Sequence, residues 1–196
     1  MKEHEVNQLD NFIGGWYIQE QVCDDLIHYF NSSKNSQPGI IFKDGIQQID
    51  KNYKDSLDLQ IDTYGINSQS DNYYDSLQSV LEKYKEKYPF CDRFNTYALI
   101  STPNIQKYPK GGGYHNWHTE RIGAAFPNVS RHLVYMTYLN DVDDDGETEF
   151  YHQKIKVKPK KGLTLIWPAD WTFAHRGISS KTQEKYIITG WYNFID

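Results

Sequence analysis

The hydrophobic pattern of this chain changes at Pro89, and the change limits the folds that it can adopt. Before Pro89, two segments carry apolar residues at helical spacing. After it, apolar and polar residues alternate in short runs separated by Gly, Asp and Pro. Alternation with a period of two places one face of a strand against a core. We therefore expect a mostly β fold with flanking helices (α+β), built as an antiparallel sandwich or double-stranded β-helix (jelly roll) with the N-terminal helices packed on one sheet.

The pattern predicts helices at about residues 19–31 and 73–88, the second capped at Ser70 or Asp71 and ended by Pro89. Strands are expected at residues 40–42, 57–61, 94–101, 132–139, 155–157, 163–167 and 186–194, after a short apolar strand or turn at 11–18. No repeat or linker interrupts the sequence. We expect one domain over residues 1–196, with a helical support region at 1–90 and a jelly-roll core at 91–196.

Composition excludes several classes of partner. The chain has 196 residues and a formal charge of −5, and no basic stripe that would neutralise the phosphates of a nucleic acid. No apolar stretch is long enough to cross a bilayer, and the polar N-terminus, which includes His4, has no signal-peptide pattern. We expect a cytoplasmic protein in which Cys23 and Cys91 are free thiols.

A His-x-Glu pair, His118 and Glu120, is the main candidate for chemistry. In an extended segment these two side chains point to the same side, so both can bind one ion. Two histidines and one carboxylate form the ligand set of non-haem Fe(II) oxygenases. The pair alone is weak evidence, because the chain has seven histidines. A zinc site that uses His115 and His118 lacks a supporting Cys pair.

Further motifs follow the pair in the order and spacing of a known family. Together with the residues around the pair they are Tyr108, Gly111–Gly113, Tyr114, His118-Thr119-Glu120, Tyr138-Leu139-Asn140, Gly146-Glu147-Thr148-Glu149-Phe150, Pro159-Lys160-Lys161-Gly162, His175, Lys185 and Trp191. On these motifs, roughly residues 95–196 resemble the Fe(II)/2-oxoglutarate-dependent dioxygenases, and among them the prolyl 4-hydroxylase group. The helix expected at 19–31 resembles that group's N-terminal helix.

The resemblance implies an iron site formed by His118, Glu120 and His175, with positions left for 2-oxoglutarate and dioxygen. It implies no catalytic side chain beyond these ligands. The residues that it assigns to the 2-oxoglutarate pocket are Lys185, Tyr108, Thr148 and Tyr138. The residues expected on the substrate side are Arg131, Trp191 and His115. Ascorbate is a further reagent that the resemblance brings into consideration.

The implied reaction decarboxylates 2-oxoglutarate to succinate and hydroxylates an unactivated C–H bond. A prolyl or other amino-acid residue in a peptide or protein is the family-level substrate, and a free amino acid or another small molecule is the alternative. The sequence leaves the oligomeric state open.

One departure from the family stands at Glu120, where the family usually has Asp. Glutamate is an adequate oxygen ligand and is one methylene longer. The substitution supports a second interpretation, a non-catalytic jelly-roll binding module with a relic metal site. A cupin-like enzyme that works without 2-oxoglutarate is a third, although it leaves Lys185 unexplained. The acidic run 141–146 matches the first half of an EF-hand loop, but His152 stands where a glutamate is needed.

Overall fold

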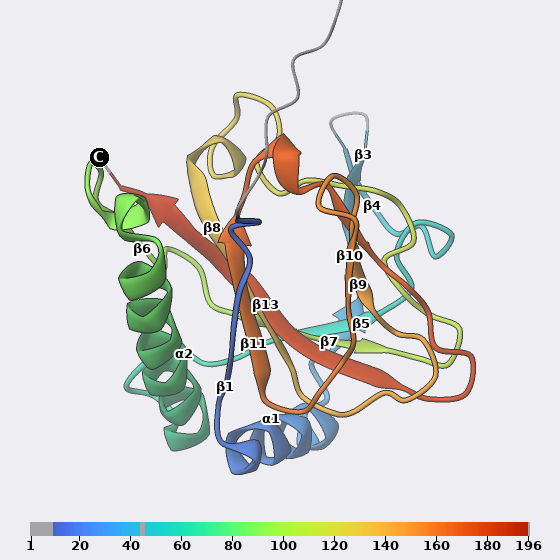
Figure 1. Ribbon diagram of the computed structural model, residues 1–196. Coiled ribbons are helices and arrows are strands. Elements are labelled where there is room, and N and C mark those ends of the chain that lie inside the picture. The colour runs from blue at the N-terminus through green and yellow to red at the C-terminus, as the bar shows by residue number, and fades with distance from the viewer. Residues whose placement is uncertain (1–9, 44–45, 196) are drawn as a thin grey trace, which may run out of the picture.

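The computed structural model describes residues 10–43 and 46–195. It confirms a mostly antiparallel β fold with two helices, α1 (Glu20–Ser32) and α2 (Ser68–Lys87), on one side of a large sheet (Figure 1). The described residues also form three short 3-10 helices: η1 (Pro89–Asp92), between α2 and the strands that follow, η2 (Asn128–Ser130) and η3 (Trp171–Phe173). The polar N-terminal segment with His4 lies outside the described residues.

Among the described residues, the larger sheet has eight strands, all antiparallel to their neighbours. Their order is β1 (Gly14–Tyr17), β11 (Leu163–Pro168), β8 (Arg131–Tyr138), β13 (Lys185–Phe194), β7 (Asn104–Tyr108), β5 (Leu57–Gln60) and β2 (Gln37–Pro38), and β6 (Tyr97–Ala98) pairs with the end of β13. Strands from the first 90 residues, β1, β2 and β5, thus extend the sheet at both of its edges.

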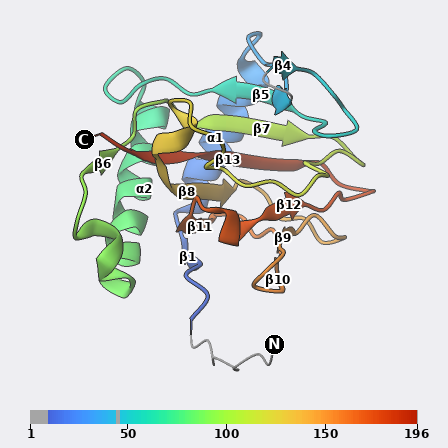
Figure 2. The same ribbon diagram turned by 90° about the horizontal axis from the view of Figure 1, so that it is seen from above.

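A smaller sheet faces part of the larger one (Figure 2). It contains β10 (Ile155–Val157), β9 (Thr148–Phe150) and β12 (His175–Gly177), in that order. Apart from both sheets, β3 (Ile41–Lys43) pairs with β4 (Ile46–Gln48) in antiparallel orientation. The two facing sheets form the expected jelly roll. A buried cluster that includes Tyr138, Phe150 and Trp167 fills the space between them.

The helices cover the opposite face of the larger sheet. From α1, Leu26 and Phe30 are buried, and from α2, Leu77 and Tyr84 are buried. They pack in one cluster with sheet residues such as Ile188. Burial of this apolar stripe stabilises the helices far more than their intrinsic propensity does. In α2 the cap is Asn67, whose side chain accepts a hydrogen bond from the Gln69 amide, and not Ser70 or Asp71. The helix begins one turn earlier than predicted because a polar run there can also be helical.

The strand pattern expected at 94–101 is mostly wrong, because only Tyr97–Ala98 forms a strand. Phe94 is instead exposed and stacks on Phe90. Both cysteines are free, as expected, and Cys23 is fully buried. No helix within residues 10–43 and 46–195 is long and apolar enough to cross a membrane.

Candidate active site

A cavity of about 540 Å³ opens between the two sheets. Eight of the ten residues assigned to a site from the sequence line it: Tyr108, His118, Glu120, Arg131, Thr148, His175, Lys185 and Trp191. They come from both sheets and from the segment that follows β7. Jelly-roll strands that are distant in sequence therefore bring these side chains together, as the order of the motifs predicts.

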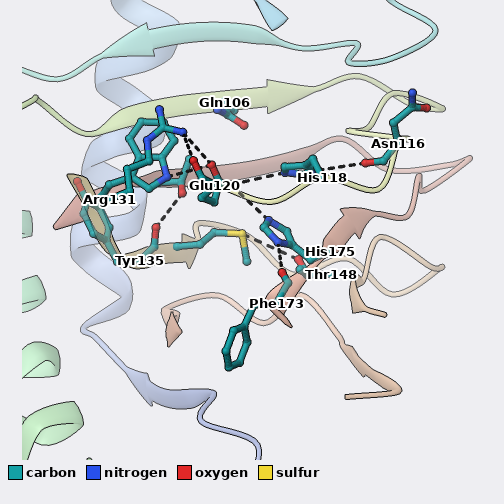
Figure 3. A network of polar contacts seen from close by, with 12 residues as sticks. Gln106, Asn116, His118, Glu120, Arg131, Tyr135, Thr148, Phe173 and His175 are labelled. Atoms are coloured by element: carbon teal, nitrogen blue, oxygen red, sulfur yellow. Dashed lines mark hydrogen bonds and ion pairs between the residues drawn. The ribbon is translucent and has the colours of Figure 1, made fainter. Parts of the chain in front are cut away.

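The side chains of His118, Glu120 and His175 converge at one point of the cavity (Figure 3). Glu120 Oε1 lies 3.5 Å from His118 Nε2 and 3.4 Å from His175 Nε2. One ligand atom from each residue lies within 4.8 Å of the other two. Among the described residues, no other group of three or more His, Cys, Asp or Glu side chains is arranged in this way. In the acidic run 141–146, Asp144 instead accepts hydrogen bonds from Ser180 and Thr182.

The backbone fixes both histidines. The amide of His118 donates to the carbonyl of His175 at 3.0 Å, and the amide of His175 donates to the carbonyl of His118 at 2.9 Å. Each ring also places its Nδ1 near a carbonyl oxygen, at 3.0 Å from Asn116 and 2.9 Å from Phe173. A proton on Nδ1 satisfies these carbonyls and leaves the Nε2 lone pair free to bind a metal ion.

Glu120 uses its two oxygens differently. Oε1 faces the histidines, whereas Oε2 accepts hydrogen bonds from Trp191 Nε1 at 3.0 Å and from Arg131 Nη1 at 3.4 Å. Burial raises the pKa of Glu120, but the neighbouring imidazoles of His118 and His175 outweigh burial and bring its pKa well below the usual range. Burial also lowers the pKa of His118, and repulsion from His175 adds to this effect. An anionic carboxylate is the form in which glutamate binds a metal ion.

Lys185 is a second buried charge in the cavity, with only 4% of its surface exposed. Its Nζ donates to the carbonyl of Gly146 at 2.8 Å and to that of Ile178 at 3.4 Å, and lies 5.2 Å from the centroid of the Tyr108 ring. Within the described part of the chain it forms no ion pair. Burial lowers its pKa to about 8, against the opposing effect of Glu147. A buried ammonium without an anion is costly, so this residue is poised to pair with an anionic ligand.

Two tyrosine hydroxyls donate hydrogen bonds in the cavity wall or behind it. Tyr108 donates to Gln106 Oε1 at 2.6 Å, and Tyr138 donates to Thr148 Oγ1 at 2.6 Å. Tyr138 does not line the cavity but supports Thr148 from behind. His115 is also absent from the cavity wall, and its Nδ1 lies 3.3 Å from Ser179 Oγ.

Residues 103–193 match the sequence model of the 2OG-Fe(II) oxygenase superfamily. The matched region contains the converging triad and Lys185. This part of the chain is similar to the 2OG-Fe(II) oxygenase superfamily. No curated protein matches the chain in sequence.

Solved structures share the fold of this chain over most of its length. A viral collagen prolyl hydroxylase of Paramecium bursaria Chlorella virus-1, in a 2OG complex, is 20% identical, with a TM-score of 0.68 over 94% of this chain and 97% of that chain. A prolyl-4-hydroxylase of Pseudomonas putida is 15% identical, with a TM-score of 0.69 over 94% of each chain. At these identities the likeness concerns the fold.

A third similar structure is a prolyl hydroxylase of Trichoplax adhaerens in complex with a peptide fragment of the hypoxia-inducible factor oxygen degradation domain. It is 15% identical to this chain, with a TM-score of 0.72 over 94% of this chain and 84% of that chain.

Two polar groups of the cavity wall were not predicted from the sequence. Gln106 lies on β7 and accepts the hydrogen bond of Tyr108. Lys54 is buried in the wall and pairs with Asp58, with 2.6 Å between Nζ and Oδ2. Asp58 also accepts hydrogen bonds from Ser56 and Asn104. The spacing of Lys54 and Asp58 is a weak signal, since pairs four residues apart are common on exposed helices.

Proposed function

We propose that this protein is an Fe(II)- and 2-oxoglutarate-dependent dioxygenase that hydroxylates a prolyl or other amino-acid residue of a peptide or protein. The observation that carries the proposal is the convergence of His118, Glu120 and His175 in a cavity whose wall also contains the buried cation Lys185. The family match over residues 103–193 supports iron, 2-oxoglutarate and dioxygen as the reagents.

The donor set fits Fe(II). Two imidazole nitrogens and one carboxylate oxygen suit this ion and leave coordination positions open on the cavity side. When bound, Fe(II) and 2-oxoglutarate supply the oxidising chemistry, in which dioxygen is consumed, succinate and CO₂ are formed and a substrate C–H bond becomes C–OH. The role of His118, Glu120 and His175 is to hold the metal in a fixed orientation. Arg131 and Trp191 hold Oε2 of Glu120 and so point its Oε1 at the histidines.

The part of the cavity wall around Lys185 fits a dicarboxylate. Lys185 supplies a positive charge that is shielded from water, where an ion pair is stronger than at the surface. The hydroxyls of Tyr108 and Thr148 lie in the same wall and can donate to a carboxylate. We assign to these three residues the binding and orientation of 2-oxoglutarate. Tyr138 has the supporting role of holding the Thr148 side chain.

The proposal of a peptidyl substrate is supported by two residues of the cavity wall and by the similar structures. Arg131 and Trp191 line the cavity beside Glu120, where a substrate would face the metal. Two of the similar structures are prolyl hydroxylases described with collagen or with a bound peptide, which supports a peptidyl substrate.

The test is iron-dependent succinate formation. The purified protein would be loaded with Fe(II) and 2-oxoglutarate without oxygen and then exposed to air, first alone and then with proline-containing peptides. We expect succinate from the native protein and none from His175→Ala. Ascorbate would be added or omitted, because its requirement stays a prediction.

A binding measurement separates an inactive preparation from a wrong assignment. We expect 2-oxoglutarate to raise the melting temperature in the presence of Mn(II), and we expect this shift to be lost in His175→Ala. If native protein gives neither succinate nor a shift, the dioxygenase assignment is wrong and a binding module with a relic site becomes the better interpretation.

A further inference from the structure

A row of aromatic side chains crosses the surface from the mouth of the cavity. Trp117 lines the cavity, and its ring meets the ring of Tyr151 edge-on, with 5.1 Å between centroids. Tyr151 meets His152 at 5.1 Å, and His152 meets Trp171 at 5.7 Å. These four residues, called here the aromatic row, belong to three segments that are far apart in sequence and that adjoin the smaller sheet.

The aromatic row is open to solvent. The exposed fraction is 68% for Trp171, 47% for Tyr151 and 37% for Trp117. Single exposed apolar residues are ordinary, but a contiguous exposed group beside a cavity marks an interaction site. The proposed chemistry inside the cavity uses none of these four side chains.

The row is held in place by contacts around it. The amide of Tyr151 donates to the carbonyl of Ala174 at 2.8 Å, and Gln153 Nε2 donates to the carbonyl of Thr172 at 3.0 Å. These bonds tie the turn after β9 to the segment that carries Trp171. A partner that binds rings already in position loses little conformational freedom of the protein.

Two cations support the row from the side. Arg176 lies 4.6 Å from the centroid of the Trp117 ring, and Lys154 lies 4.3 Å from that of Tyr151. Arg176 is itself paired with Glu149 at 2.8 Å. Such stacking fixes the planes of the rings and leaves their remaining edges and faces available.

We propose that the aromatic row binds a proline-rich flank of the substrate polypeptide, in the polyproline II conformation, while the target residue enters the cavity. The proposal rests on the proposed function and makes it specific, because a free amino acid would never reach the row. Polyproline II chains dock on rows of aromatic rings because they are already extended and rigid. The row is continuous with the cavity through Trp117, which makes one continuous ligand its natural occupant.

The length of the row sets the length of the flank. Its three steps, of 5.1, 5.1 and 5.7 Å, span at most roughly five residues of a polyproline II chain, which rises about 3.1 Å per residue. Affinity should therefore increase with flank length up to that point and then level off. Only a flank on one side of the target residue, N-terminal or C-terminal, should show the increase.

The test measures binding without turnover. Fluorescein-labelled peptides of about twelve residues, long enough for cavity and row at about 3.1 Å per residue, would carry proline-rich flanks before or after the target proline. Their Kd would be measured by anisotropy on the purified protein, beside a Gly/Ser-rich peptide of equal length. We expect one proline-rich series to bind more tightly than the other and than the Gly/Ser peptide.

Trp171→Ala and Tyr151→Ala are the informative variants, because both side chains are exposed and neither lines the cavity. Each should weaken the favoured peptide by about three- to tenfold, the effect of losing one aromatic contact. The matched control is Phe90→Ala, in η1, whose side chain is 67% exposed and which belongs neither to the cavity nor to the row. The control should leave the Kd unchanged.

The outcomes separate this proposal from the proposed function. Tight binding that depends on Trp171 and Tyr151, with neither succinate nor a 2-oxoglutarate-dependent shift in melting temperature, would keep the peptide-binding row and overturn the dioxygenase assignment. Succinate formation with equal Kd for all peptides, or with equal losses in Phe90→Ala and Trp171→Ala, would keep the enzyme and overturn the row.

Discussion

The guanidinium carbon of Arg131 lies 3.6 Å from the centroid of the Trp191 ring, and both side chains donate a hydrogen bond to Glu120. Arg131 also donates to the backbone carbonyl of Glu120 at 2.7 Å. The stacked pair therefore donates to two oxygens of Glu120, which are Oε2 of the carboxylate and the backbone carbonyl oxygen. The oxygen that remains faces His118 and His175.

The Trp191 hydrogen bond gives the first prediction. Trp191→Phe keeps a ring under Arg131 but removes the N–H donor, so Glu120 loses part of its orientation. We expect Mn(II) affinity to fall about tenfold, at the lower end of the effects seen when partners of metal ligands are removed. Titration with Mn(II) by electron paramagnetic resonance would measure this. Trp171→Phe, at an exposed tryptophan, is the control, and equal affinities in both variants would contradict the orienting role.

The second prediction concerns the extra methylene of Glu120. In this backbone, Glu120 Oε1 already lies 3.4 to 3.5 Å from both imidazoles. Shortening the side chain by one C–C bond, about 1.5 Å, withdraws the carboxylate from that point. We expect Glu120→Asp to bind Mn(II) about tenfold more weakly. Glu120→Gln keeps the length and removes the charge, and should bind still more weakly. Tighter Mn(II) binding by Glu120→Asp would mean that the carboxylate does not need the extra methylene to reach the metal ion.

The third prediction follows from Lys185, whose pKa burial lowers to about 8. The charged form is needed to bind a carboxylate, so affinity for 2-oxoglutarate should fall about tenfold per pH unit above about pH 8. Isothermal titration with Mn(II) present, between pH 7 and 9.5, would measure the change. A pH-independent affinity would exclude Lys185 as the partner of the ligand.

The same shift predicts how the unliganded protein responds to pH. The folded-state pKa lies below that of an exposed lysine, so the unfolded state binds more protons between about pH 8 and 10.5 and this group adds stability as pH rises through that window. Below pH 8 the buried charge is a cost. Lys185→Met should therefore raise the melting temperature at pH 7 while abolishing the 2-oxoglutarate-dependent shift. A variant that is destabilised at pH 7 would contradict this account.

A fourth prediction concerns Tyr135, whose buried hydroxyl has no hydrogen-bond partner among the described residues. An unpartnered buried hydroxyl is destabilising, so Tyr135→Phe should be neutral or stabilise the fold by up to about 1 kcal/mol. Tyr138→Phe removes a hydroxyl that is bonded to Thr148 and Val157, and should cost about 1 kcal/mol. Urea unfolding of the two variants gives the comparison. A loss of stability in Tyr135→Phe equal to that in Tyr138→Phe would mean that the Tyr135 hydroxyl has a partner.

Because Gly190 has no side chain, the Tyr135 ring has room beside it in the core. A Cβ at this position would lie 2.1 Å from the Tyr135 hydroxyl oxygen. Gly190→Ala should destabilise the fold by about 2 kcal/mol, as other overpacked cores do. In a Tyr135→Phe background the loss should be smaller, although the ring carbon at 2.6 Å keeps part of the clash. Equal losses in the two backgrounds would contradict a clash with the hydroxyl.

Elements with long regular patterns were predictable from the sequence. The α1 helix carries four buried residues on one face, and β8 and β13 are long and largely buried. The strands β9 and β12 have three residues each, too few to display any period. The β7 strand was missed because Ile105 packs toward the helices while Gln106 faces the cavity, so the buried residues do not form one apolar series.

The site was predictable where local motifs carry it. His118 and Glu120 share one segment, and the spacing of His175 and Lys185 follows the family pattern. Lys54 and Asp58 carry no such signal, because their place in the cavity wall depends on how the segment before β5 packs beside Tyr114. The supporting position of Tyr138 likewise depends on the distance between the two sheets.

His118 and His175 are joined by two backbone hydrogen bonds, so their relative position does not depend on a bound metal ion. These bonds join the segment of one ligand to β12 through the main chain alone, without any contribution from a side chain. A chelator should therefore remove the metal and leave the two ligands in place. Amide hydrogen exchange at these positions would remain slow after chelation, and the emptied protein would accept a different divalent ion without refolding.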